Sequence, residues 1–288
     1  MQCQTGFQMH RLNKKDIPGL IALSASVGWD YDEQEINTIM SVGIVYGHKN
    51  EQGDIISSAA IIPYDNKLAS IGMVIVNENY RGNGLGKELT QACINSVPNE
   101  TTIMLIATKE GKPLYEKLGF QTVTYVHKFL SDNYMPLYSD HENKEYEIIP
   151  LTDSHFSQVQ ELDQSAIGAD RSTFLKCRIQ QAKQGVVVRN NNGDIVGYGL
   201  SIEGPINLIL GPIVAINHDV ATYIIEHLTK GYQGKLRIDV PDGQESFIMY
   251  LEKCGFHKVG QPPVMVKNSI QLPPRNNTLY GIAAQIFG

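Results

Sequence analysis

The stretch Arg81-Gly82-Asn83-Gly84-Leu85-Gly86 decides the fold, because it joins an apolar strand to an amphipathic helix and is half glycine. Glycine lets the backbone turn tightly, and its missing side chain allows successive N–H groups to approach a bound anion. The start of the following helix adds the positive end of its dipole at the same place. The stretch therefore predicts a cradle for a pyrophosphate group, and a purely structural turn is the alternative.

Two familiar phosphate-binding motifs do not fit this loop. A P-loop ends in Gly-Lys-Ser/Thr, whereas Gly86-Lys87 is followed by Glu88. The dinucleotide fingerprint follows the first strand of a βαβ unit, whereas this loop follows three strands that alternate with period two and are joined by short turns. We expect these strands at Val42–Tyr46, Ile55–Ile62 and Ala69–Val76. The loop therefore ends an antiparallel meander.

The elements around the meander follow from apolar periodicity. Leu85, Leu89, Cys93 and Val97 lie on one face of a helix after the loop. The remaining predicted elements of the first half are helices near Ile17–Leu23, Glu33–Met40 and Pro113–Leu118, and strands at Gly6–Arg11, Thr102–Ala107 and Gln121–Leu130. The predicted order is β-α-α-β-β-β-α-β-α-β.

The second half of the chain echoes the first. The segment Leu114–Phe120 (LYEKLGF) resembles Tyr250–Phe256 (YLEKCGF), and the turn around Gly53-Asp54-Ile55 resembles that around Gly193-Asp194-Ile195. The two offsets, 136 and 140 residues, are nearly equal and occur in the same order. This agreement predicts a tandem duplication, with residues 131–146 as a polar linker and 269–288 as a tail that docks on the rest of the protein.

The first half resembles the GNAT N-acyltransferases, which bind acetyl-CoA. Arg81, Gly84 and Gly86 match the Arg/Gln-x-x-Gly-x-Gly/Ala pyrophosphate loop of that superfamily, after a strand that ends in Met73-Val74-Ile75-Val76. Pro113–Phe120 resembles its later helix-to-strand signature. The resemblance implies an α/β fold of two tandem GNAT-like domains, each a mixed, mainly antiparallel sheet flanked by helices. Residues 1–130 are then the catalytic acetyl-CoA-binding domain.

Residues 147–268 resemble a degenerate copy of the same domain. After the expected strand Leu208–Val214 the chain reads Ala215-Ile216-Asn217-His218-Asp219-Val220-Ala221, which contains no glycine. Asp219 at the start of the next helix would repel a phosphate group. We therefore expect this copy to lack the pyrophosphate loop, so that the chain has one cofactor site.

The resemblance implies direct transfer of acetyl from acetyl-CoA to an amine in a ternary complex, without an acyl-enzyme. The N–H groups of a splayed strand would then polarise the thioester carbonyl, and the N–H of Val74 is the predicted oxyanion donor. The residues predicted to bind the cofactor are Met73, Val74, Ile75, Val76, Arg81, Gly82, Asn83, Gly84, Leu85, Gly86, Lys87 and Thr108. Thr108 stands where relatives often carry an asparagine.

Tyr115 is the predicted general acid. It stands where the superfamily often has a tyrosine that protonates the leaving thiolate, and a phenol with a pKa near 10 is protonated at neutral pH. The alternative is a helix tyrosine packed on the core.

The acceptor amine is predicted to meet the segment Trp29-Asp30-Tyr31-Asp32-Glu33. This segment joins the first two helices, which overhang the acceptor pocket in GNAT proteins, and its carboxylates and aromatic rings suit an ammonium group. Trp29, Asp30 and Glu33 are the predicted substrate residues. The alternative is a solvated helix start capped by Asp30 or Asp32.

Composition narrows the class of protein. The 288 residues suit two domains, and the net charge of −6 argues against general binding to nucleic acid or anionic membranes. No apolar run could span a bilayer, and the chain start lacks the apolar region of a signal peptide, which predicts a cytoplasmic protein. Four scattered cysteines, Cys3, Cys93, Cys177 and Cys254, predict buried thiols and no metal site.

The sequence thus predicts an N-acetyltransferase that acts on the primary amine of a small molecule. Acetylation of a protein or peptide, and a non-catalytic acyl-CoA-binding module, remain open alternatives. The sequence leaves the oligomeric state, the acceptor and the general base undetermined.

Overall fold

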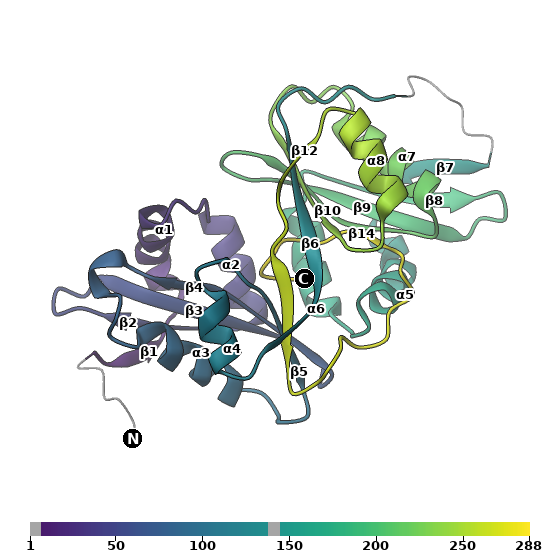
Figure 1. Ribbon diagram of the computed structural model, residues 1–288. Coiled ribbons are helices and arrows are strands. Elements are labelled where there is room, and N and C mark those ends of the chain that lie inside the picture. Colours follow the sequence, from purple (N-terminus) through teal and green to yellow (C-terminus); the bar gives the residue numbers. More distant parts are fainter. Residues whose placement is uncertain (1–6, 138–144) are drawn as a thin grey trace.

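A computed structural model describes residues 7–137 and 145–288, so Cys3 and the middle of the predicted linker lie outside the described residues (Figure 1). The first half contains β1 (Met9–Arg11), α1 (Ile17–Ser26), α2 (Glu33–Val42), β2 (Ile44–Lys49), β3 (Ile55–Tyr64), β4 (Leu68–Val76), α3 (Leu85–Asn95), β5 (Thr102–Ile106), α4 (Lys112–Lys117) and β6 (Gln121–Ser131). The second half contains β7 (Tyr146–Pro150), α5 (Phe156–Ile167), α6 (Ser172–Gln181), β8 (Gln184–Asn190), β9 (Ile195–Glu203), β10 (Leu208–Ala215), α7 (His218–Thr229), β11 (Leu236–Pro241), α8 (Glu245–Lys253), β12 (His257–Gly260), β13 (Pro263–Lys267) and β14 (Leu279–Gly281).

The predicted order of elements in the first half is present. Several boundaries shift by a few residues; the strand expected at Val42–Tyr46, for example, runs from Ile44 to Lys49. The chain up to Val42 continues α2, whose buried residues Ile36 and Ile39 pack into the core, and Gly43 then takes an extended conformation that ends the helix. Packing of the helix face thus extends α2 beyond the end that local periodicity indicated.

The strands form a mixed, largely antiparallel sheet flanked by helices, as the predicted fold class requires. Its order is β1-β2-β3-β4-β5-β13-β6-β11-β10-β9-β8-β7, with β12 beside β6 and β14 beside β10. Among the described strands, the pairs β4–β5 and β10–β11 are parallel and the other pairs are antiparallel. Each half thus contributes one parallel pair, between the fourth and the fifth strand of its own sequence of strands.

The two halves exchange their last strands. β13, near the end of the second half, lies between β5 and β6 of the first half. β6 in turn pairs with β11 of the second half from Val126 to Ser131. Figure 1 shows both strands crossing the middle of the molecule. The predicted boundaries at 130 and 268 assign each strand to its own half, whereas hydrogen bonding joins the halves into a continuous sheet.

The duplication is visible in the local geometry of the two repeated segments. Asn50 and Asn190 close the equivalent turns with the same pattern, in which the asparagine Oδ1 accepts from the N–H of Asp54 or Asp194. Gly119 and Gly255 both take the left-handed conformation, with φ of 87° and 90°, at the ends of α4 and α8. The repeat is therefore structural as well as sequential.

The halves share a hydrophobic core. One cluster of buried side chains combines Leu20 and Ile36 from α1 and α2 with Phe174 and Leu175 from α6, and Phe287 of the tail lies among them. Burial of such side chains contributes roughly 1.5–3 kcal/mol each. An interface of this kind is a continuous core, so the two halves are expected to unfold together.

The tail completes the interface. β14 pairs with β10, and the chain then runs along the first half, where the Tyr64 and Ser70 hydroxyls each donate a 2.7 Å hydrogen bond to the backbone oxygens of Phe287 and Ile286. Ile286 lies against Gly72 so closely that a Cβ on that glycine would come within 2.5 Å of it. The tail is thus an integral part of both halves.

Candidate functional site

The central strands of the first half separate in the middle of their length. β4 and β5 pair only from Leu68 to Ile71 and from Thr102 to Leu105. Just beyond this pairing Met73 has a φ of +51°, which is uncommon for a residue with a side chain, and the β3–β4 register shifts nearby. The Ser58 hydroxyl stabilises this irregularity by donating a 2.8 Å hydrogen bond to the Met73 backbone oxygen. The result is a slot between β4 and β5 that begins at Met73.

The glycine-rich loop lies at the far end of β4. Gly82 and Gly84 have φ of +84° and +78°, which residues with side chains rarely adopt. Gly84 is the cap of α3 and offers no side chain to its first turn, so the first N–H groups of α3 have no intrahelical partner. Asn83 holds the loop by donating to the Tyr80 backbone oxygen at 3.0 Å. The loop therefore leaves N–H groups and a helix dipole for an anion.

A groove of about 650 Å³ connects the slot to the loop. Its size lies within the range of roughly 300–1,000 Å³ for sites that hold sizeable ligands. Of the predicted cofactor residues, all but Asn83 line it, together with Tyr115 and Trp29. Arg81 is 57% exposed at its mouth, 3.7 Å from Glu78, so its guanidinium remains accessible to an anion.

Tyr115 and Thr108 lie on the α4 side of the groove. Tyr115 is 7% exposed and its ring packs edge-on against Phe120. Burial, with a smaller contribution from Cys93, raises the pKa of Tyr115 to about 12, so the phenol stays protonated at neutral pH. The Thr108 hydroxyl accepts a 3.0 Å hydrogen bond from the Gly111 N–H and thereby fixes the start of α4.

A second cavity, of about 220 Å³, meets the groove at the open end of the slot. Trp29, Ile71–Met73, Ile106 and Thr108 line both cavities. We call the second cavity the chamber. Its walls come from the segment after α1, from residues 202–205 of the second half, and from residues 284–286 of the tail. The chamber thus exists only where both halves and the tail come together.

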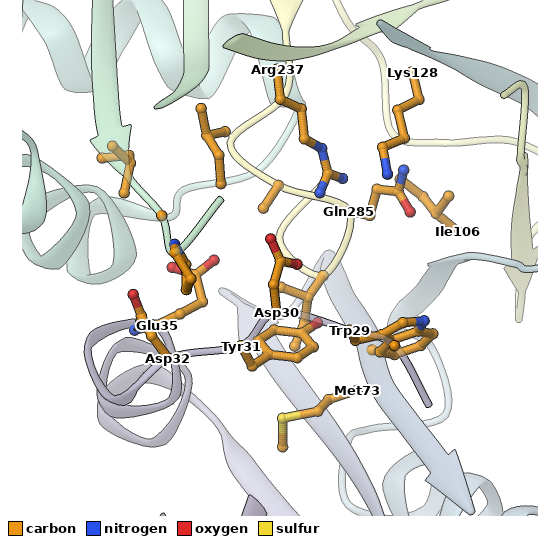
Figure 2. A pocket seen from close by; sticks show the side chains of 18 of the residues that line it. Trp29, Asp30, Tyr31, Asp32, Glu35, Met73, Ile106, Lys128, Arg237 and Gln285 are labelled. Atoms are coloured by element: carbon orange, nitrogen blue, oxygen red, sulfur yellow. Dashed lines mark hydrogen bonds between the residues drawn. The ribbon is translucent and has the colours of Figure 1, made fainter. Parts of the chain in front are cut away.

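Charged groups face the chamber from opposite sides. Figure 2 shows the Asp30 carboxylate on one side and Lys128, Arg237 and Gln285 on the other. Burial, followed by the nearby Arg237, lowers the pKa of Lys128. Asp239 accepts from both Arg237 Nε at 2.8 Å and Gln285 Nε2 at 3.0 Å, which orients those two side chains.

The predicted substrate segment divides between the chamber and its entrance. Trp29 and Asp30 line the chamber. Asp32 caps α2, because its carboxylate accepts from the Glu35 N–H at 2.7 Å, as the structural alternative proposed. Glu33 is exposed in the first turn of α2 and lines an outer mouth that opens beside the chamber.

Several chamber residues were not identified from the sequence. Glu35 forms an ion pair with the buried Arg178 of α6, which also donates to the Ala283 backbone oxygen of the tail at 2.8 Å. Lys128, Arg237 and Gln285 come from β6, β11 and the tail. Local pattern carries no signal for such residues, because the strand exchange and the course of the tail bring them together.

The corresponding slot in the second half is filled by the protein itself. β10 and β11 pair only at Leu208 and Ile209, and beyond this point the tail lies beside them, with Ile282 donating its N–H to the Asp239 backbone oxygen at 2.9 Å. The helix that follows β10 is capped by Asn217, whose side chain accepts from the Val220 N–H. Leu251, fully buried, occupies the place of Tyr115 in the repeated segment. This half therefore presents neither a glycine loop nor an open slot.

Two further observations concern other classes of site. Within residues 7–137 and 145–288, no group of three or more His, Cys, Asp or Glu side chains is placed to hold a metal ion. In the same ranges no helix combines the length and the apolar character needed to cross a membrane.

Known proteins resemble this chain along its whole length. Family models described as acetyltransferase (GNAT) domains match residues 31–131 and, separately, 159–281. The uncharacterized N-acetyltransferase YitH of Bacillus subtilis (strain 168) is 37% identical over 282 residues, which cover 98% of each chain.

Solved structures share the fold. A putative acetyltransferase from Pyrococcus horikoshii superimposes with a TM-score of 0.82 at 20% identity, covering 98% of this chain and 96% of its own. A tandem GNAT protein from the clavulanic acid biosynthesis pathway gives a TM-score of 0.69 at 13% identity, covering 92% and 99%. With two GNAT domains in tandem and a full-length relative, the chain belongs to the GNAT family of N-acetyltransferases.

Proposed function

We propose that the first half binds acetyl-CoA in the groove and that its acetyl group passes directly to the primary amine of a small molecule in the chamber. The observation that carries the proposal is the meeting of the two cavities at Met73 and Thr108, where the slot opens. A thioester that enters from the loop side and an amine that enters from the chamber side would meet there, as direct attack requires.

The residues present fit the cofactor. The loop offers backbone N–H groups and the start of α3 to the pyrophosphate, while Arg81 and Lys87 border the same groove. The slot between β4 and β5 is lined by apolar side chains from Ile71 to Val76. It suits the extended part of the cofactor, which would form hydrogen bonds with the strand backbone. Binding through the backbone explains why the site needs few charged side chains.

In the proposed reaction the amine nitrogen forms a bond to the acetyl carbon while the carbon–sulfur bond breaks. The Val74 N–H stabilises the negative charge that develops on the carbonyl oxygen. Tyr115 donates its proton to the departing thiolate and is reprotonated from solvent. Asp30 lies on the chamber side and attracts the ammonium form of the acceptor. The ammonium loses one proton to water in the chamber before the attack, and the nitrogen loses a second proton to water as the amide forms.

The size of the chamber supports a small acceptor. Its volume of about 220 Å³ lies below the range of roughly 300–1,000 Å³ found for drug-sized ligands, and walls from both halves and the tail surround it. A folded protein would have to present its lysine through the outer mouth, between the start of α2 and residues 203–205. We therefore place protein acetylation second.

Calorimetric titration with acetyl-CoA, combined with a panel of primary amines followed by release of free thiol, tests the proposal. We expect one acetyl-CoA site per chain and thiol release with small amines. Two sites, or no binding, would contradict the assignment of the groove. Release with peptides but not with free amines would support protein acetylation, and binding without release across the whole panel would support a non-catalytic module.

A further inference from the structure

Two cations, Lys128 and Arg237, line the chamber. Lys128 is half buried on β6, and no ion pair joins it to a carboxylate among the described residues. Its neighbour in the β6–β11 register is Asp239, which is 2% exposed. That carboxylate already binds Arg237 through both Nε and Nη2 at 2.8 Å and also accepts from Gln285. The hydrogen bonds of Asp239 thus go to Arg237 and Gln285, and Lys128 lies beside it as a second cation.

Most acidic groups around the chamber already have partners. Asp32 caps α2, Glu35 pairs with Arg178, and Glu203 pairs with Lys183 at 2.9 Å. Asp30 has no such hydrogen bond or ion pair within residues 7–137 and 145–288, and Figure 2 shows it across the chamber from Arg237. The chamber thus presents one available anion and one available cation on opposite walls.

Asp30 and Lys128, on opposite walls of the chamber, suit a ligand that carries both a positive and a negative charge. Two like charges held together in a partly desolvated site repel, and an anion that bridges them gains charge-assisted hydrogen bonds. Gln285 adds a polar group whose Nε2 is committed to Asp239, which leaves its Oε1 to accept a hydrogen bond. An ammonium group and an anionic group on one small molecule would satisfy both walls.

We propose that the acceptor is an amino-acid-like zwitterion, whose carboxylate binds Lys128 and Arg237 and whose amine faces Asp30 and the slot. This inference rests on the proposed acetyl transfer and specifies its substrate class. The carboxylate selects and positions the molecule, while the amine is the reacting group. Lys128 and Arg237 are then specificity residues. Lys128 comes from β6 of the first half, and Arg237 comes from β11 of the second half, with which β6 pairs.

Matched pairs of acceptors test the inference. Each pair is an amino acid and the amine left when its carboxylate is removed, such as tyrosine with tyramine and histidine with histamine. For at least one pair, the wild-type protein is expected to show a kcat/KM about ten- to a hundredfold higher for the amino acid, the value of a charge-assisted hydrogen bond. An equal or higher kcat/KM for the amine in every pair would overturn the inference.

Substitution of Lys128 separates recognition from other roles. Lys128→Gln should remove most of the preference by raising KM for the amino acid, with the amine nearly unaffected, while Lys128→Arg should retain the preference. Lys67→Gln, at an exposed turn that lines neither cavity, is the matched control. Equal losses of kcat for both members of a pair in Lys128→Gln would indicate a catalytic or structural role and would count against the inference.

Two further measurements complete the test. An aminoalkyl phosphate of similar size distinguishes the anion, and a tenfold preference for it over the amino acid would overturn the carboxylate assignment. Acetyl-CoA affinity, measured by calorimetry for the wild type and Lys128→Gln, should be the same. If acetyl-CoA does not bind the wild type, the proposed function itself fails; if it binds and simple amines react without preference, only the zwitterion inference fails.

Discussion

The two halves of the chain build the same slot and use it differently. In the first half β4 and β5 separate at Met73 and leave an open groove, whereas in the second half residues 279–282 lie between β10 and β11. In the first half the helix after the slot begins with Gly84 and no side-chain cap; in the second half it begins with Asn217, which caps its own helix. The second half thus satisfies internally what the first half offers to a ligand.

This difference explains why a duplicated fold presents one open slot. A slot between two parallel strands exposes backbone groups that need partners, and a chain segment or an extended ligand can supply them. The tail supplies them in the second half and then continues to the chamber, where residues 284–286 form part of the wall. The filled slot therefore fixes the position of the chamber beside the open slot.

The largest effect is expected from removing the tail. Deletion of residues 277–288 takes away Leu279, Ile282, Ile286 and Phe287, all less than 5% exposed. Each such loss costs about 2–5 kcal/mol, and their sum approaches or exceeds the usual stability of about 5–15 kcal/mol. We expect denaturant titration of the shortened chain, monitored by far-UV circular dichroism, to show no cooperative unfolding transition.

A milder variant tests whether the tail alone blocks a second cofactor site. Ile282→Ala should lower the free energy of unfolding by about 2–5 kcal/mol and leave a folded protein whose second slot is loosened. Calorimetry should still give one acetyl-CoA per chain, because the second half has no glycine loop. A stoichiometry of two would show that the tail, and not the missing loop, separates the halves.

Gly84→Asp should have the next largest effect, on acetyl-CoA binding. A carboxylate about 4 Å from a phosphate charge costs roughly 4 kcal/mol at an effective dielectric of 20, and the left-handed φ of +78° adds strain. We expect calorimetry to show a loss of affinity of about a hundredfold or more.

The matched change in the second half is Asn217→Asp, which retains a good helix cap. It should leave acetyl-CoA affinity unchanged. Equal losses from the two substitutions would mean that the second half also binds the cofactor.

Replacement of Tyr115 should reduce catalysis without reducing binding. Tyr115→Phe removes the proposed acid, for which a loss of about a hundredfold in kcat is expected, while the acetyl-CoA affinity measured by calorimetry stays the same. The repeated segment of the second half already carries Leu251 at this position, so the two halves differ here in chemistry more than in shape.

The pH dependence follows from the same group. An acid must be protonated to act, and burial raises the pKa of Tyr115 to about 12. Loss of its proton should therefore not reduce kcat between about pH 7 and about pH 10, a range in which an unperturbed tyrosine with a pKa near 10 would begin to titrate. An alkaline decline near pH 10 that disappears in Tyr115→Phe would place the pKa of this tyrosine at its ordinary value.

The sequence predicted local features and missed those formed over long distances. The loop 81–86 and the strand before it carry their signal in consecutive residues, so fold class and family could be predicted. Trp29 and Asp30 could be proposed as acceptor residues because the family resemblance places the segment between the first two helices over the acceptor pocket. Lys128 and Arg237 were missed, because β6 and β11 are more than 100 residues apart and pair only through the exchange of strands. Periodicity within a strand does not specify its neighbour.

The smallest expected effect tests whether the halves remain equivalent away from the site. Gly53 and Gly193 occupy the repeated turns with φ of +85° and +87°, and neither has an atom within 4 Å of an added Cβ. Gly53→Ala and Gly193→Ala should therefore each cost about 1 kcal/mol through backbone strain alone. Chemical denaturation of the two single variants and the double variant measures these costs.

The losses of stability in Gly53→Ala and Gly193→Ala indicate whether the two halves differ only at their slots. The turns lie at opposite ends of the molecule, so the double variant should lose the sum of the single losses to within about 0.5 kcal/mol. Acetyl-CoA affinity should be unchanged in all three. Equal costs would show that duplication preserved the structural turns while the slots diverged. If Gly193→Ala were much less costly than Gly53→Ala, the second half would have lost structural as well as functional constraint.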